Sequence, residues 1–287
     1  MANNQEIVIY HSPDADDAFM FYGLQCGAVQ VPGFTFRHEL CDIETLNHRT
    51  LRGELDVTAA SVHAYAHLFS NYAVLRCGAS MGGVDYGPCL IANSSFDLAD
   101  GKRRTIAIPG QYTSAALALK IWLRENSIEA DLPIIFFDKV QDAVRSGEVD
   151  AGVIIHEGQL THQREGFTHL LDLGAWWWKK TSLPLPLGVN LVRKALGQAA
   201  MAATYQALRE SIEYSLAHRE EALTYALSYG RGLSRKDADR FVAMYVNERT
   251  RDIGEEGMRS IEQFLALGAE YGFVPRDVRP AFVPESR

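Results

Sequence analysis

The sequence is short of cysteine, of positive charge and of long apolar runs. Its 287 residues include 4 cysteines and no C-x-x-C pair, so a disulfide framework is not indicated. The 28 Lys and Arg are outnumbered by 36 Asp and Glu, and a net charge of −8 argues against a nucleic-acid partner, because phosphate binding needs a cationic surface. No apolar run approaches the roughly 20 residues of a membrane span, so no membrane partner is expected.

The first residues, MANNQEIVIYHSPDADDAF, lack the basic segment and apolar run of a secretory signal. Together with the scattered cysteines, this predicts a cytoplasmic protein. The motifs G-x-x-x-x-G-K-[ST] and G-x-G-x-x-G are absent, so nucleotide phosphates are not indicated. No G-x-S-x-G elbow is present either, which leaves a serine hydrolase unsupported.

The first two thirds of the chain alternate short β-branched runs with helical segments. The strand-like runs lie at 6–10, 34–40, 73–79, 105–108, 133–137, 151–155 and 189–193. Strands that alternate with helices predict an α/β fold with a largely parallel sheet.

The last third of the chain has no strand-like runs, and apolar residues recur there at three- and four-residue spacing. This pattern predicts about three helices, over 199–229, 234–249 and 255–271. The expected helix cap and stops are Ser234 with Asp237, and Gly230, Gly232 and Gly254.

Two proline-containing segments are candidates for crossings between two lobes. GPCLIA at 87–92 joins a Gly-Pro turn to an apolar run, and SLPLPLGVNLV at 182–192 leads into a strand through two prolines and a glycine. Two crossings would make residues 93–183 an inserted lobe and residues 1–92 with 184–287 the other lobe. A cleft between α/β lobes is a common place for a small-molecule site.

The segment IVIYHSPDADDAF predicts a strand, a turn and the acidic start of a helix. Asp14, Asp16 and Asp17 stand where a helix N-terminus favours negative charge, by about 0.3–1 kcal/mol each, which explains them structurally. A ligand-facing role stays open, because open α/β sheets bind ligands at the carboxyl ends of their strands. The acids lack the wider spacing of a calcium loop, so no metal site is expected.

A second loop joins the run at 105–108 to a helix rich in Ala and Leu. Pro109-Gly110 is followed by Thr113 and Ser114, of which one hydroxyl can cap the helix. The other hydroxyl, with exposed N–H groups, can receive an anion or a carbonyl oxygen. A plain helix cap explains the pair equally well.

A third loop follows the run at 151–155 and begins with His156-Glu157-Gly158. A zinc-protease H-E-x-x-H motif would need a histidine where Leu160 stands, so that site is excluded. A histidine at a strand end is commonly structural. An imidazole that titrates near neutral pH and points into a cleft also suits a general base, and both alternatives stay open for His156.

Seven segments in order carry a resemblance to a known family. They are SPDADDAFMFYGL (12–24), GELDVTAASVHAYAH (53–67), GPCLIA (87–92), IAIPGQYTSAA (106–116), GEVDAGVIIHEGQ (147–159), DLGAWW (172–177) and LPLPLGVNLVRKAL (183–196). The chain resembles the 1,4-dihydroxy-6-naphthoate synthase family of the futalosine route to menaquinone, from residue 6 to about residue 196. The resemblance implies a type 2 periplasmic-binding-protein fold, with two α/β lobes around a cleft and a helical C-terminal region. It also implies conversion of cyclic dehypoxanthine futalosine to 1,4-dihydroxy-6-naphthoate by ring opening and loss of a sugar-derived fragment.

The resemblance also implies roles for single residues. The histidine of the family's I-H-E-G motif, its proposed catalytic base, falls on His156. The family's pair of hydroxyl residues after the P-G turn falls on Thr113 and Ser114, and the serine of its D-V-T-K-x-S pattern falls on Ser61. The expected substrate-binding residues are Ser12, Asp17, Ser61, Thr113 and Ser114. The reaction requires no metal and no redox cofactor, and the expected ligand is a small aromatic carboxylate.

Two positions depart from the family pattern. Ala59 stands where a lysine usually follows D-V-T, which removes a cation for a substrate carboxylate. The usual S-P-C-P-N-D-T-F reads SPDADDAF at 12–19, which is more acidic. The alternatives are a non-catalytic solute-binding protein for an aromatic carboxylate, which Ala59 favours, and chorismate dehydratase, a sister family that matches I-H-E-G and LPLPLG less well. A homodimer is a further expectation.

Overall fold

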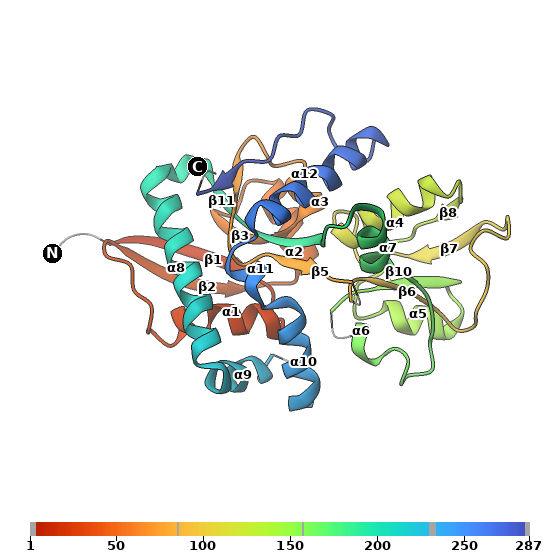
Figure 1. Ribbon diagram of the computed structural model, residues 1–287, viewed down its shortest axis with the longest axis horizontal. Coiled ribbons are helices and arrows are strands. Elements are labelled where there is room, and N and C mark those ends of the chain that lie inside the picture. The colour runs from red at the N-terminus through yellow and green to blue at the C-terminus, as the bar shows by residue number, and fades with distance from the viewer. Residues whose placement is uncertain (1–3, 85, 157, 230–233, 285–287) are drawn as a thin grey trace.

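The computed structural model describes residues 4–84, 86–156, 158–229 and 234–284. The chain forms two β-sheets with helices packed around each (Figure 1). The first sheet has seven strands in the order β12-β4-β11-β3-β1-β2, with β5 paired to β11. Its strands are β1 (Gln5–His11), β2 (Phe34–Leu40), β3 (Val57–Ser61), β4 (Tyr72–Leu75), β5 (Ser80–Gly82), β11 (Leu185–Arg193) and β12 (Phe282–Val283).

The second sheet occupies the other half of the molecule and has five strands in the order β10-β6-β9-β7-β8 (Figure 1). They are β6 (Cys89–Ala92), β7 (Arg104–Ala107), β8 (Ala130–Asp131), β9 (Ala151–Ile154) and β10 (Thr168–Asp172). The helices of this half are α4 (Ser114–Glu125), α5 (Val140–Ser146), α6 (Gly158–Thr161) and α7 (Leu173–Thr181). The alternation of strands and helices confirms the predicted α/β class. The expected largely parallel sheet was wrong: both sheets are mixed, because β11 pairs antiparallel with β3, β4 and β5, and β6 pairs antiparallel with β9 and β10.

The remaining helices belong with the first sheet. They are α1 (Ala15–Gln25), α2 (Ile43–Leu51), α3 (Val62–Tyr65), a 3₁₀ helix (Lys194–Leu196), α8 (Gly197–Ala217), α9 (Arg219–Leu227), α10 (Arg235–Tyr245), α11 (Glu248–Arg251) and α12 (Gly254–Glu270). The amphipathic spacing in the last third of the sequence explains the packing of α10 and α12, because it places an apolar stripe along each of them. Within the described residues, no helix is both long enough and apolar enough to cross a membrane.

Parallel pairing brings the functional loops together. β1 pairs in parallel with β2 and with β3, and β7 pairs in parallel with β9, where Ile106 lies opposite Ala151. The carboxyl ends of parallel neighbours lie at the same edge of a sheet. The loops that follow β7 and β9 therefore start side by side.

Two of the predicted elements differ in the structure. The strand predicted at 133–137 was wrong: the segment forms one isolated bridge, between Ile108 and Ile134. Ile134 is 56% exposed and Phe136 is 48% exposed, so this apolar run does not enter a sheet interior. The helix predicted over 199–229 breaks at His218, where φ is −114° and ψ is 48°.

The C-terminal region is helical as predicted, but it is divided into α8 to α12 rather than about three helices. Ser234 caps α10 by accepting a hydrogen bond from the backbone N–H of Asp237, as expected. Gly254 begins α12 instead of ending a helix. The other two expected stops, Gly230 and Gly232, lie outside the described residues.

The chain passes between the two sheets where the proline-containing segments lie. β5 belongs to the first sheet and β6 to the second, and after α7 the chain returns to the first sheet in β11. The expected lobes, residues 1–92 with 184–287 and residues 93–183, stay a proposal. The pairing of β6 with β9 and β10 favours a first boundary before Cys89.

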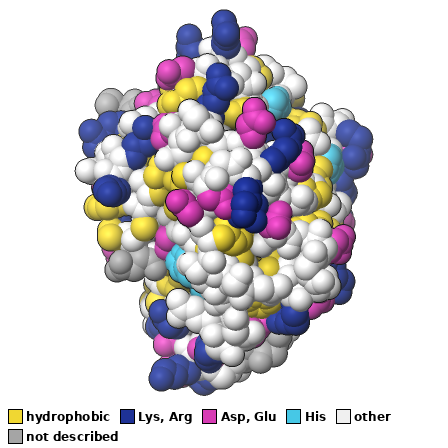
Figure 2. Space-filling model, turned by 90° about the vertical axis from the view of Figure 1, so that its right-hand side faces the viewer, with side chains coloured by type: hydrophobic (Ala, Val, Ile, Leu, Met, Phe, Trp, Pro, Cys, Tyr) yellow, Lys and Arg dark blue, Asp and Glu magenta, His cyan; other side chains and the backbone are white. Residues whose placement is uncertain are grey.

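The outer face of the second half carries both signs of charge. Lys and Arg side chains alternate there with Asp and Glu over the surface (Figure 2). Arg103 pairs with Asp131 at 2.6 Å and Arg104 pairs with Asp100 at 2.6 Å. Such exposed pairs add little stability, but they break up single-sign patches. All four cysteines are free.

Candidate functional site

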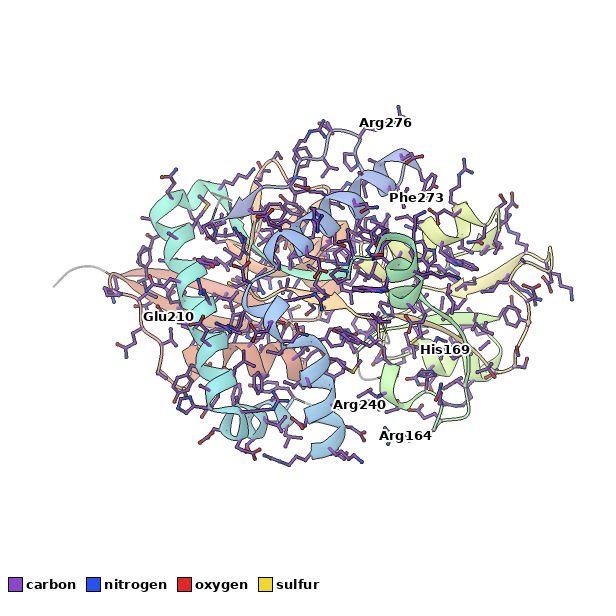
Figure 3. All side chains as sticks on the ribbon, in the orientation of Figure 1. Arg164, His169, Glu210, Arg240, Phe273 and Arg276 are labelled. Atoms are coloured by element: carbon purple, nitrogen blue, oxygen red, sulfur yellow. The ribbon has the colours of Figure 1, made fainter. Side chains whose placement is uncertain are left out.

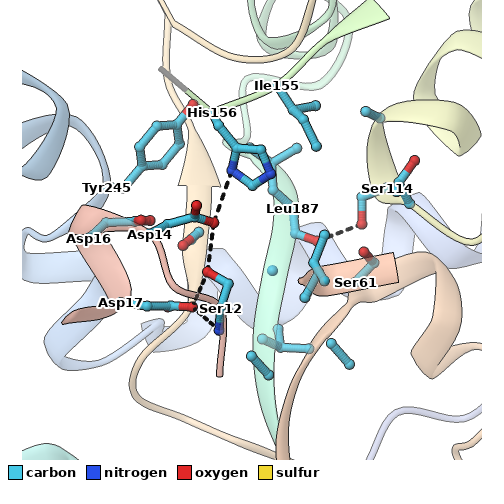
Figure 4. Close-up of a pocket in the computed structure, with 18 of the residues that line it drawn as sticks. Ser12, Asp14, Asp16, Asp17, Ser61, Ser114, Ile155, His156, Leu187 and Tyr245 are labelled. Carbon is cyan, nitrogen blue, oxygen red and sulfur yellow. Dashed lines mark hydrogen bonds and ion pairs between the residues drawn. The ribbon is translucent and has the colours of Figure 1, made fainter. Parts of the chain in front are cut away.

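A pocket lies between the two halves, and residues from both sheets line it (Figure 4). The first half contributes the β1–α1 loop, the end of β3 and part of β11, while the second contributes the start of α4 and the residues after β9. α10 adds Phe241 and Tyr245. All six residues expected from the sequence line this one pocket: Ser12, Asp17, Ser61, Thr113, Ser114 and His156.

Thr113 and Ser114 lie where β7 leads into α4. The Thr113 hydroxyl accepts a hydrogen bond from the backbone N–H of Ala116 at 3.2 Å and donates to the carbonyl of Gly110 at 3.0 Å. The Ser114 hydroxyl donates to the carbonyl of Leu187 on β11 at 2.5 Å. One hydroxyl therefore caps α4, and the other joins α4 to the first sheet.

Ser61 ends β3 and precedes α3. Its backbone N–H donates to Asn47 Oδ1 at 2.9 Å, and Asn47 Nδ2 donates to the Ser61 hydroxyl oxygen at 3.1 Å. Asn47 lies on α2 and is fully buried. This amide fixes the orientation of the Ser61 hydroxyl at the pocket wall.

The β1–α1 loop carries a buried network of one serine and two carboxyl groups. The Ser12 hydroxyl oxygen lies 2.6 Å from Asp14 Oδ2 and 2.7 Å from Asp17 Oδ2. The Ser12 backbone N–H also donates to Asp17 Oδ2, at 2.9 Å. Burial raises the pKa of the Asp17 carboxyl to about 7, although the hydrogen bond that it accepts from the Ser12 backbone N–H lowers it.

His156 follows β9 and reaches across to this network. Its Nδ1 lies 3.1 Å from Asp14 Oδ2, and its side chain is 17% exposed. The ring of Phe137 packs edge-on against the imidazole with centroids 4.9 Å apart. The φ of His156 is +57°, in the left-handed region that few non-glycine residues adopt and that is found disproportionately at functional sites.

His156, Thr113 and Ser114 line one pocket, but each side chain bonds to a different partner. His156 is bonded to Asp14, while the two hydroxyls are bonded to Gly110 and Leu187. The expected substrate contacts of these residues stay a prediction. The remaining nitrogen of the His156 ring points toward the side of the pocket where Ser114 lies (Figure 4).

The sequence left a ligand-facing role open for Asp14, which stands where the family resemblance has cysteine, but it gave no partner for this residue. Gln159 and Tyr245 were not singled out, yet the Tyr245 hydroxyl donates to Gln159 Oε1 at 2.7 Å. No local motif marks Tyr245, because it comes from a C-terminal helix.

The pocket is acidic. Asp14, Asp16 and Asp17 line it, and no Lys or Arg is found among the described lining residues. Ala59, the position of the family's usual lysine, lines it too. N–H groups and hydroxyls are therefore the donors that the described lining offers to an anionic group. In the part of the chain that the structure describes, no group of three or more His, Cys, Asp or Glu side chains could hold a metal ion.

Comparisons with known proteins identify the family of this chain. The family model described as menaquinone biosynthesis matches residues 7–270. A Thermus thermophilus protein named 1,4-dihydroxy-6-naphtoate synthase is 38% identical, covering 95% of this chain and 97% of that protein. A Streptomyces coelicolor protein of the same name is 33% identical, covering 93% of this chain and 94% of that protein.

Solved structures share the fold. A crystal structure of an Archaeoglobus fulgidus protein superimposes with a TM-score of 0.88 at 40% identity, covering 94% of this chain and 98% of that one. A Candida albicans protein described as having the generic periplasmic binding protein fold gives a TM-score of 0.67 at 12% identity, covering 92% and 90%. These matches confirm the predicted periplasmic-binding-protein-like fold. With a family model that spans nearly the whole chain and two relatives above 30% identity, the chain belongs to the menaquinone biosynthesis family.

Proposed function

We propose that this enzyme converts cyclic dehypoxanthine futalosine to 1,4-dihydroxy-6-naphthoate in menaquinone biosynthesis, as a carbon–carbon/carbon–oxygen lyase of the cytoplasm. The names of the two relatives support the product, because these proteins align with more than 90% of this chain. The observation that carries the proposal is the placement of His156 in the pocket, with one ring nitrogen bonded to Asp14.

In the proposed reaction, His156 removes a substrate proton that an adjacent carbonyl makes acidic. Its free ring nitrogen faces the pocket, within which the substrate would lie. The first N–H groups of α4 have no partner inside the helix, so Ser114 and Ala115 offer backbone donors at a positive helix end. These donors suit a substrate carboxylate in a pocket whose described lining contains no cationic side chain other than histidine.

A second candidate is a non-catalytic binding protein for an aromatic carboxylate. Ala59 favours it, because a lysine usual in the family is missing.

Incubation of the purified protein with cyclic dehypoxanthine futalosine, and separately with chorismate, followed by mass spectrometry, distinguishes the candidates. We expect the dihydroxynaphthoate from the first substrate only. Binding without turnover would indicate the binding protein, and dehydration of chorismate would indicate the sister activity. The expected homodimer is tested by sedimentation analysis of the same sample.

A further inference from the structure

We propose that Asp14 is a positioning residue that holds the His156 ring with its hydrogen on Nδ1, so that Nε2 is the atom that accepts the substrate proton. This inference rests on the proposed function and deepens it, because it assigns the residue that orients the base. Asp14 comes from the β1–α1 loop of the first half, and His156 follows β9 of the second half. The contact between them therefore spans the pocket.

The placement of Asp14 is not that of a helix cap. Asp14 occupies the N-cap position of α1, with φ −102° and ψ 157°, but its side chain makes no cap hydrogen bond to the described residues of that helix. Its Oδ2 atom is bonded instead to the Ser12 hydroxyl and to His156 Nδ1. An acid at a helix start ordinarily satisfies the first N–H groups. Asp14 instead bonds to two residues of the pocket wall.

The number of hydrogens in the network limits the direction of each bond. A hydroxyl has one hydrogen, and the Ser12 hydroxyl oxygen lies within 2.7 Å of both Asp14 Oδ2 and Asp17 Oδ2. Ser12 can donate to only one carboxyl, and the other short contact gains a hydrogen when the second carboxyl donates to Ser12. Because Asp14 also faces His156 Nδ1, we assign Asp14 as the acceptor of both bonds and Asp17 as the carboxyl that holds a proton.

The environment of Asp17 agrees with this count. Burial raises its pKa to about 7, so its proton persists at a pH where an ordinary aspartate has lost it. The resulting order is Asp17 O–H to Ser12, Ser12 O–H to Asp14, and His156 Nδ1–H to Asp14. Asp14 then carries the single negative charge of the network.

This order determines what happens when the base works. The carbon–hydrogen bond of the substrate breaks, its electron pair stays on the substrate carbon, and its proton forms a bond with Nε2. The Nδ1 hydrogen stays in place, and the imidazolium is stabilised by the carboxylate 3.1 Å away. Asp14 is neither protonated nor deprotonated in the step. The other titratable groups in the described pocket wall are Asp16 and Tyr245.

The first test needs no substrate. In protein labelled with ¹⁵N-histidine, the shifts of the two His156 nitrogens report which one carries the hydrogen, and His156→Asn assigns the signals. We expect Nδ1–H with an unprotonated Nε2 in the neutral ring of the wild type. The opposite tautomer in the wild type would overturn the inference without any Asp14 variant.

The second test uses Asp14→Asn, which keeps the side-chain size and removes the charge, with Asp16→Asn as the matched control on the same wall. We expect Asp14→Asn to lose the Nδ1–H preference and to lower kcat and kcat/KM together by about 10²–10⁴-fold, with KM little changed. We expect Asp16→Asn to keep the tautomer. An equal change of tautomer in both variants would show a general charge effect and overturn the inference.

The outcomes separate this inference from the proposed function. If the wild type converts cyclic dehypoxanthine futalosine and Asp14→Asn matches it in tautomer and kcat, the positioning role fails and the proposed function stands. If the wild type has the Nδ1–H tautomer, and only Asp14→Asn loses it, but the substrate is not converted, the positioning role stands and the proposed substrate fails. Thermal unfolding of each variant confirms that folded protein is compared.

Discussion

At the scale of the residue, the two nitrogens of one imidazole have different surroundings. Nδ1 of His156 contacts a carboxylate, and the other nitrogen faces the pocket. We expect His156→Asn to keep the fold, because Asn tolerates the left-handed backbone found here, where φ is +57°. We expect turnover to fall by about 10²–10⁴-fold, the usual contribution of general base catalysis.

Turnover and melting temperature measured on the same His156→Asn sample check this prediction. A purely structural histidine would give the reverse pattern, with a lower melting temperature and near-normal turnover of the folded fraction. The strand end and the family motif were enough to predict His156 from the sequence. Asp14 could not be paired with it, because their contact depends on how two separate sheets face each other.

Asp17 predicts a pH effect on stability. Its carboxyl has an ordinary pKa of 3.8 and a folded pKa of about 7, so the folded state holds the proton between these values. The contribution of Asp17 to the free energy of unfolding therefore decreases as pH rises from about 4 to 7, because in that interval this carboxyl ionises in the unfolded chain and not in the folded one.

We expect Asp17→Asn to remove this loss. The melting temperature of the variant minus that of the wild type should increase with pH between about 4 and 7 and level off above. If Asp17→Asn also changes stability by an amount that does not depend on pH, the whole curve of melting-temperature difference against pH shifts, but its slope stays the same. Differential scanning calorimetry across this range measures it, and two parallel curves would contradict the raised pKa.

At the scale of the element, the start of α4 depends on one hydroxyl. Thr113 caps the helix through the N–H of Ala116 and bonds the turn at Gly110. We expect Thr113→Ala to lower the free energy of unfolding by about 0.5–2 kcal/mol and Thr113→Ser to restore most of it. Urea denaturation measures both variants.

The same two variants test the expected substrate contact. If the Thr113 hydroxyl also binds substrate, Thr113→Ala weakens binding by about 0.5–1.5 kcal/mol beyond the loss of folded protein, and Thr113→Ser does not. Titration calorimetry on folded samples measures this. Equal affinities of the wild type and Thr113→Ala would leave Thr113 with a structural role alone.

Element prediction succeeded where a pattern had a single physical cause. Ser234 followed by Asp237 gave a helix cap because the spacing fits the first turn. The run at 133–137 failed, because an apolar, β-branched composition suits a strand but does not supply a neighbour to pair with. The break at His218 also escaped prediction, since amphipathic spacing continues through it.

At the scale of the whole molecule, α10 connects the two halves beside the pocket. Tyr245 donates to Gln159 on α6, and Asp237 pairs with Arg164 at 3.1 Å. Figure 3 shows Arg164 near Arg240, which lies midway along α10. These contacts oppose separation of the halves, which the sequence could not reveal, although its Gly-Pro and Pro-rich segments did mark where the chain passes between the sheets.

We expect Tyr245→Phe to loosen this connection. Loss of one buried hydrogen bond costs about 0.5–1.5 kcal/mol, so amide exchange in α6 should become faster and substrate binding weaker by roughly 2–13-fold. Hydrogen exchange and titration calorimetry measure these effects. Arg164→Ala is the matched control, because its side chain is 60% exposed and such pairs contribute little. Unchanged exchange in Tyr245→Phe would contradict the role of α10.

The left-handed backbone of His156 also restricts how this enzyme could acquire a different base. Glutamate or lysine at this position would adopt φ +57° only with steric strain, whereas aspartate, like histidine and asparagine, tolerates it. An aspartate there would face Asp14 as a second carboxylate, and the repulsion would raise the pKa of the pair. An aspartate in place of His156 would therefore require a second exchange, at Asp14, whereas the family pattern shows that the position of Asp14 can change while the histidine stays.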